Sequence, residues 1–142
     1  MRYCTPNFPC DFEIPDDWVR DASIDNFAPS ARAYCSTPEA LLVPLSEVIP
    51  PVRKLTFAKD WRGFERARLL SLLRGIVAGQ QIEPVPLIQL PDPNPILPLT
   101  YRYSVRDGFH RFYASIIAGF SELPAKIETL ADVLRQSHEL GW

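Results

Sequence analysis

The sequence predicts a small α+β domain, in which helices flank a short mixed sheet. Two segments, 61–78 and 109–118, place their apolar residues at the spacing of amphipathic helices. Four short segments that are apolar or alternate in polarity have the character of strands: 41–45, 84–90, 101–106 and 123–127. A chain of 142 residues is long enough for one such domain with a core of its own.

Residues 1–40 are predicted to form an irregular N-terminal extension of a domain that spans 41–142. Five prolines interrupt this segment, and no long apolar period runs through it. Six aromatic side chains argue against disorder, because disordered segments are poor in such residues. The extension is therefore expected to wrap onto the domain.

The domain is expected to begin with a short apolar strand at 41–45. Prolines at 50–51 keep the following chain extended, since the residue before a proline avoids the helical region. Asp60 is suited to cap the helix at 61–78, and Gly79 is suited to end it.

The middle of the domain is predicted to hold two strands. The prolines of the first, 84–90, indicate that it starts there or lies at an edge of the sheet. A stiff proline-rich loop, 91–99, leads to the second strand at 101–106, whose residues alternate between polar and apolar.

The last third is predicted to contain two helices and one strand. The helix at 109–118 is followed by Gly119, which suits the left-handed position after a helix end. A short strand at 123–127 comes next, and a C-terminal helix is expected from about 128 to 140.

Charge is distributed unevenly along a chain whose formal net charge is −2. Residues 1–50 carry three basic and eight acidic side chains, whereas residues 51–74 carry seven basic and two acidic ones. A nearly neutral total therefore conceals a basic region. Such a total gives no overall attraction to nucleic acid or to anionic membranes.

Targeting signals and cysteine usage indicate a cytoplasmic protein without membrane association. No charged and then apolar leader is present, and no apolar run approaches the length of a membrane span. Cys4, Cys10 and Cys35 are expected to be reduced thiols, because their spacing is loose for a zinc site and the chain has only two histidines.

Residues with the chemistry to bind an anion gather where the strand at 101–106 meets the helix at 109–118. Gly108 permits positive φ and close approach of a ligand to the backbone, and a helix start presents unsatisfied N–H groups. His110 can donate or shuttle a proton, and Arg111 offers a planar donor fork that matches phosphate oxygens. Asp107 could cap the helix or hold a cation.

Two readings of this segment remain open on the sequence alone. Asp107 and Gly108 could simply form a turn in which the aspartate caps the helix and Arg111 is solvated. With His110 and Arg111 added at the helix start, we favour an anion site. Arg53, which follows the first proline turn, is either the distant arginine that converges on the same anion or a surface charge.

Several parts of the sequence together resemble the ParB/sulfiredoxin superfamily over roughly residues 41–128. They are Arg53 after its proline turn, the segment 83–85 (Glu-Pro-Val), the segment 106–111 (Arg-Asp-Gly-Phe-His-Arg), Gly119, and the segment 123–125 (Leu-Pro-Ala). The resemblance implies a small mixed α/β domain whose pocket binds nucleotide phosphates, with ATP or CTP as ligand. By position, phosphate would be contacted by Arg53, Gly108, Phe109, His110 and Arg111.

The sequence also departs from the pattern of this superfamily. Phe109 stands where sulfiredoxins carry their catalytic cysteine, so sulfinic-acid repair is not expected. The residues 50–53 lack the carboxylate base of the free-serine kinases. Few residues follow Ile127, so the DNA-binding and dimerisation parts of partition proteins are not expected.

The resulting hypothesis is an NTP hydrolase or a ParB-like nuclease. His110, Arg111 and Asp107 would be the catalytic residues, and Asp107 or Glu83 would hold Mg²⁺. The alternative is a non-catalytic nucleotide-sensing module in plasmid, phage or chromosome maintenance, with DNA or another protein as partner. The oligomeric state is left open.

Overall fold

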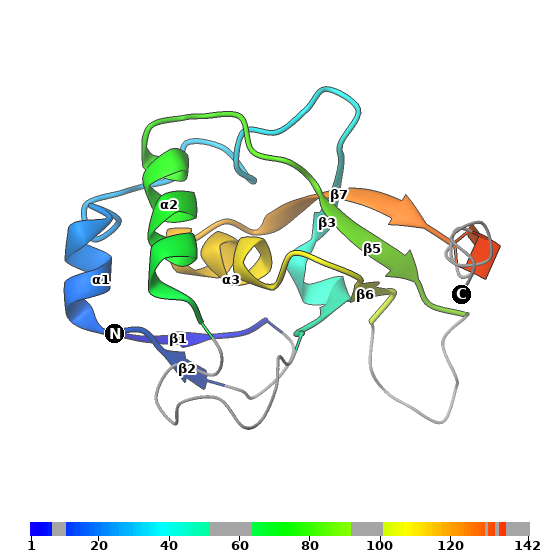
Figure 1. The fold of residues 1–142 in the computed structure, drawn as a ribbon, viewed down its shortest axis with the longest axis horizontal. Helices are drawn as coiled ribbons and strands as arrows, with labels where there is room; N and C mark the ends of the chain where they lie inside the picture. The colour runs from blue at the N-terminus through cyan, green and yellow to red at the C-terminus, as the bar shows by residue number, and fades with distance from the viewer. Residues whose placement is uncertain (7–10, 52–63, 92–100, 130, 133, 136–142) are drawn as a thin grey trace.

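The computed structural model describes the chain except for residues 7–10, 52–63, 92–100, 130, 133 and 136–142, and it has an α+β fold (Figure 1). In chain order the elements are β1 (Arg2–Cys4), β2 (Asp11–Glu13), α1 (Asp16–Asp21), β3 (Leu41–Pro44), the 3₁₀ turn η1 (Leu45–Glu47), β4 (Val48–Ile49), α2 (Arg66–Val77), β5 (Val85–Gln89), β6 (Tyr103–Val105), α3 (Phe109–Ala118) and β7 (Glu122–Glu128).

The main sheet is mixed, as the sequence predicts. Its strand order is β3-β7-β5-β6-β4. The β7 strand runs antiparallel to β3 and parallel to β5, whereas β6 runs antiparallel to β5 and parallel to β4. Strands β1 and β2 form a separate antiparallel pair. The strands at 41–45, 84–90, 101–106 and 123–127 are thus confirmed, with small changes at their ends.

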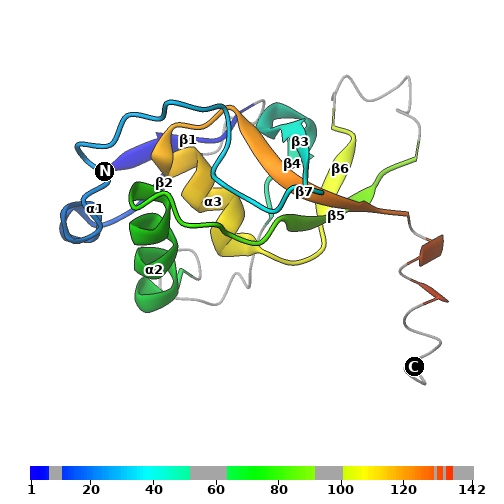
Figure 2. The same ribbon diagram turned by 90° about the horizontal axis from the view of Figure 1, so that it is seen from above.

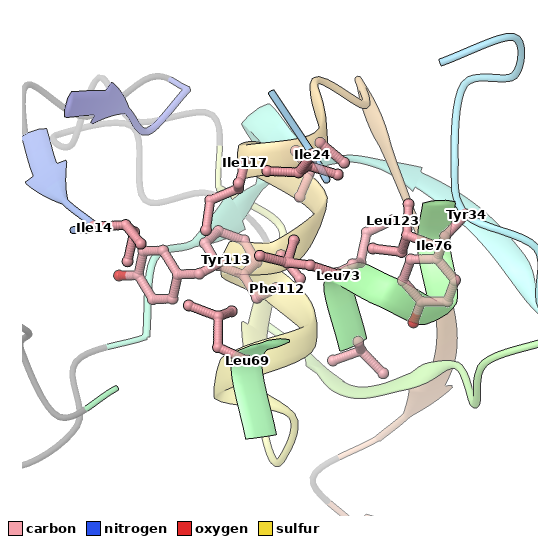
Figure 3. Packing of buried hydrophobic residues seen from close by; sticks show 14 of the residues in the cluster. Ile14, Ile24, Tyr34, Leu69, Leu73, Ile76, Phe112, Tyr113, Ile117 and Leu123 are labelled. Atoms are coloured by element: carbon pink, nitrogen blue, oxygen red, sulfur yellow. The ribbon is translucent and has the colours of Figure 1, made fainter. Parts of the chain in front are cut away.

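One face of the main sheet carries the core, and helices cover it. The register aligns Val43 with Leu123 and Val85 with Ala125, and all four side chains are buried. In both views α3 lies between α2 and the sheet (Figures 1 and 2). Leu73 of α2 is directed toward the α3 residues at the centre of this core (Figure 3).

The N-terminal 40 residues differ from the expected irregular extension. They contain the β1–β2 pair and α1, and they contribute Ile14, Trp18, Ile24 and Tyr34 to the same buried cluster as the helices. Strands of three residues and a helix of six are too short to produce a recognisable apolar period. The segment is part of the core because its apolar side chains fill the space beside α2 and α3.

The α2 helix begins later than predicted, at Arg66. The expected cap, Asp60, lies outside the described residues. Glu65 occupies the cap position with extended backbone angles, and the preceding Phe64 is buried against Phe109. This packing favours an extended backbone over a further helical turn. The end agrees with the prediction, since Gly79 adopts a φ of +70° after the last turn.

The β5 strand is central, so of the two alternatives the strand start is confirmed and the edge position is wrong. Pro86 is tolerated there because it is the second residue of the strand. Its carbonyl accepts the N–H of Arg106 at 3.0 Å, where the chain has already left β6. The N–H that proline lacks would face the same side, just beyond the end of β6, so a bond is missing only at the end of the β5–β6 ladder.

The C-terminal helix can be followed only in part. Strand β7 extends to Glu128, so the helix cannot begin at that residue as predicted. Thr129 and Asp132 exchange hydrogen bonds between their side chains and backbone N–H groups, and the backbone at 131–132 and 134–135 is helical. Thr129 therefore caps the helix start. Among the residues that the structure describes, no helix is long and apolar enough to cross a membrane.

Candidate functional site

A pocket of about 850 Å³ lies between the starts of α2 and α3. Its lining comes from three parts of the chain. These are Pro51, two residues after β4, one side of α2, and the stretch from the end of β6 through the first turn of α3. In chain order the lining residues are Pro51, Ala67, Arg68, Ser71, Leu72 and residues 105–111. The sequence segment singled out for anion binding thus forms one wall, and α2 forms another.

The turn before α3 depends on Gly108. This residue caps α3 with a φ of +103°, and its N–H donates to Oδ1 of Asp107 at 2.8 Å. A Cβ at this position would lie 3.1 Å from Nε and Nη2 of Arg111 and 3.2 Å from Cγ1 of Val85. Gly108 has no side chain with which to cap α3, and the N–H groups of a first helical turn have no acceptor within the helix.

Arg111 is anchored to the sheet. Its Nη1 donates to the carbonyl of Pro84 at 2.7 Å and, less closely, to that of Glu83 at 3.3 Å. The guanidinium also lies against Gly108. Arg111 therefore lines the pocket, but part of its donor fork is used to fix the turn against the start of β5.

The carbonyl of Glu83 has a second donor, the hydroxyl of Tyr34 at 2.7 Å. Tyr34 is buried, and this burial raises the pKa of its phenol above the ordinary value, with Arg111 acting in the opposite direction. The N-terminal segment, the start of β5 and the α3 arginine are thus connected through one carbonyl group.

His110 is buried at the junction of the two helices. Its ring is 3% exposed and packs against Phe64 and Phe109. The Nε2 atom accepts the backbone N–H of Glu65 at 2.9 Å, so this nitrogen carries no proton. The expected role of His110 as phosphate ligand or general acid stays a prediction, and the observed contact is with the start of α2.

Of the two carboxylates predicted to bind a metal, Asp107 lines the pocket and Glu83 does not. Asp107 is exposed at the pocket, with Oδ1 engaged by Gly108, whereas Glu83 does not line the pocket. Within the described ranges, no group of three or more His, Cys, Asp or Glu side chains could hold a metal ion. Mg²⁺ at nucleotide sites is commonly held by one or two carboxylates together with phosphate oxygens and water, so Mg²⁺ binding at Asp107 stays a prediction. Arg53 lies outside the described residues.

Sequence reasoning missed Arg68 and Ser71, which lie three residues apart on the pocket side of α2. Arg68 is exposed and makes no hydrogen bond or ion pair with any described residue. The neighbouring Arg66, in contrast, forms an ion pair with Asp21 of α1. The spacing of the arginines in α2 is the sequence signal that could have indicated Arg68. This spacing does not show which arginine faces the pocket.

Charge in the pocket is mainly positive. Arg68, Arg106 and Arg111 line it, against a single acid, Asp107. Arg106 is paired with Glu128 of β7, which is largely buried. Among the described residues neither Arg68 nor Arg111 has an acidic partner, but Arg111 donates to the carbonyls of Pro84 and Glu83, whereas Arg68 has no such bond.

Comparison of the chain with protein-family models, with curated proteins and with solved structures finds no match. The geometry of the pocket is therefore the basis for a functional assignment.

Proposed function

We propose that the protein is a non-catalytic module that binds the phosphate groups of a nucleotide in the pocket between α2 and α3. The observation that carries this proposal is that Arg68, which has no acidic partner among the described residues, lines the same pocket as the first turn of α3. An anion between them would accept charge-assisted hydrogen bonds from the guanidinium. It would also accept hydrogen bonds from main-chain N–H groups and be stabilised by the helix dipole.

The dimensions and apolar lining support a nucleotide over a free phosphate ion. The volume of about 850 Å³ lies within the range of small-molecule sites and far exceeds a single phosphate group. Pro51, Ala67, Leu72, Val105 and Phe109 add apolar surface to the lining. This surface would accommodate the sugar and base, and the resemblance described above favours ATP or CTP.

Binding is better supported than catalysis. His110 offers its Nε2 to a backbone N–H, and Asp107 is the single pocket acid among the described residues. Hydrolysis of the nucleotide and cleavage of a nucleic-acid phosphodiester stay predictions. Both would be detected by phosphate release and plasmid nicking, measured with and without Mg²⁺.

A thermal-shift panel of CTP, ATP, ADP and GTP tests the proposal directly, because a ligand that binds the folded state raises the unfolding temperature. We expect at least one nucleotide to raise it, and Arg68→Ala to weaken that nucleotide about 10- to 100-fold. This is the range expected when a charged hydrogen bond worth about 1.5–3 kcal/mol is lost.

Arg66→Ala is the matched control. It removes the same charge from the same helix, but Arg66 pairs with Asp21 and does not line the pocket. Equal affinities for the Arg66 and Arg68 variants would contradict the assignment of the pocket. Absence of a shift with all four nucleotides would contradict the nucleotide proposal itself.

A further inference from the structure

We infer that His110 is a positioning residue of this pocket, which holds the start of α2 in place through the N–H of Glu65. This inference rests on the proposed nucleotide binding, because it concerns the shape of that site. It differs from the sequence-based expectation, in which His110 contacts phosphate itself.

The bond between His110 and Glu65 connects the two pocket walls directly. Glu65 is the cap residue of α2, and His110 is the second residue of α3, 45 positions further along the chain. The side chain of Glu65 makes no capping hydrogen bond to α2. The imidazole Nε2 therefore supplies the acceptor for a backbone group that the helix itself leaves without a partner.

Burial makes this contact specific. His110 is 3% exposed, and Phe64 and Phe109 pack against its ring, with ring centroids 6.0 Å and 5.3 Å away. Glu65 itself is exposed and the bond is part-buried, so loss of the acceptor returns this N–H to solvent and frees the start of α2 from His110. The same burial leaves little of the ring for a direct contact with a ligand.

The consequence for the pocket follows from helix geometry. Arg68 lies three residues after Glu65, within the first turn of α2, and Ala67 beside it also lines the pocket. A shift of the α2 start would move the Arg68 wall relative to Gly108 and the start of α3. A change of about 1 Å is large compared with the tolerance of a charge-assisted hydrogen bond.

Two substitutions at position 110 separate positioning from direct ligation. His110→Ala removes the acceptor, whereas His110→Gln places an amide oxygen near the site of Nε2 and can still accept the Glu65 N–H. Ser115→Ala is the control, because Ser115 is also a buried polar residue of α3 but bonds within the helix to the carbonyl of Arg111. Far-UV circular dichroism first establishes that each variant is folded.

Two measurements are then made on each variant. Hydrogen exchange of the Glu65 amide, followed by NMR without nucleotide, reports on the bond itself. Calorimetric titration with CTP, ATP, ADP and GTP reports on the pocket. We expect His110→Ala to speed exchange of this amide at least 10-fold and to weaken the best nucleotide at least 10-fold. We expect His110→Gln and Ser115→Ala to stay near wild type in both.

Three results would overturn the inference. One is unchanged exchange of the Glu65 amide in His110→Ala. Another is faster exchange with unchanged nucleotide affinity. The third is a loss of affinity in His110→Gln while the Glu65 amide stays protected, which would make His110 a direct ligand. If wild type binds none of the four nucleotides, the proposed function fails and the claim about the pocket fails with it, whereas the exchange data still decide whether the bond exists.

Discussion

Replacing Gly108 by alanine perturbs the turn on which the pocket depends. Two costs follow from the structure. The φ of +103° is a conformation that residues with a Cβ rarely adopt, and such strain costs on the order of 1–3 kcal/mol. The new Cβ would also lie 3.1 Å from two nitrogens of Arg111 and 3.2 Å from Val85.

The neighbours determine how this crowding is relieved. Val85 is fully buried and has no free space, so Arg111 must move. Its hydrogen bonds to the carbonyls of Pro84 and Glu83 would then be weakened or lost, at a cost of about 1.5–3 kcal/mol for a charged donor. The combined loss is about 2.5–6 kcal/mol, a large part of the stability of a domain of this size.

Urea unfolding followed by far-UV circular dichroism measures this loss, and Gly79→Ala is the control. Gly79 also has a positive φ, of +70°, but nothing lies within 4 Å of a Cβ at that position. Gly79→Ala therefore introduces backbone strain but no steric contact, and we expect it to lower the free energy of unfolding by about 1–2 kcal/mol. The difference between the two variants isolates the contact between Gly108 and Arg111.

Equal losses of stability in the two variants would refute this reasoning. Such a result would mean that the guanidinium does not lie against Gly108, or that it moves away without cost. A loss below about 1 kcal/mol for Gly108→Ala would further mean that the turn relaxes to a negative φ, so that the described start of α3 is not required for folding.

Three further substitutions test the core and its connections. Leu73→Ala, in the buried contact between α2 and α3, should lower the free energy of unfolding by about 2–5 kcal/mol in urea titration. Tyr34→Phe should cost about 1 kcal/mol at neutral pH through the lost bond to the Glu83 carbonyl. Burial raises the pKa of Tyr34, so the phenol of the unfolded chain releases its proton first as pH rises above about 10. The stability of the wild type should therefore fall over this range, and urea midpoints measured between about pH 8 and 11 should fall less for Tyr34→Phe. Glu128→Gln should lower the free energy of unfolding by about 1–2 kcal/mol, because Arg106 loses a largely buried anionic partner. The same loss of stability when Glu128→Gln is made in an Arg106→Ala protein would contradict the pairing.

The local sequence was sufficient to predict those elements whose apolar residues complete a full repeat and whose end is marked by a glycine. The helix at 109–118 coincides with α3 because Phe112, Tyr113 and Ile117 follow the helical repeat and Gly119 takes a φ of +90°. The N-terminal elements lacked this information. Residues 11–21 hold a three-residue strand and a six-residue helix, whose apolar side chains are recognised as core only once α2 and α3 are in place beside them.

The position of β5 shows a different limit. The proline at 86 correctly indicates that one backbone donor is missing, but it does not tell which side of the strand that donor would face. The answer depends on where β6 ends, and this is determined by the turn at 106–108. A central strand and an edge strand are therefore both compatible with the same local sequence.

The same dependence on distant parts of the chain explains why the sequence indicates a segment that lines the pocket but not the contacts of its residues. His110 and Arg111 were selected for the chemistry of their side chains, yet their observed partners are main-chain groups 45 and 27 residues away. No local pattern encodes such partners. Because these side chains support the turn and the α2 start, a substitution at either position is expected to disturb the pocket whether or not the side chain touches a ligand. Loss of binding in an alanine variant alone is therefore no proof of ligation, and Arg68, which supports no described part of the fold, is the residue at which binding and folding are tested separately.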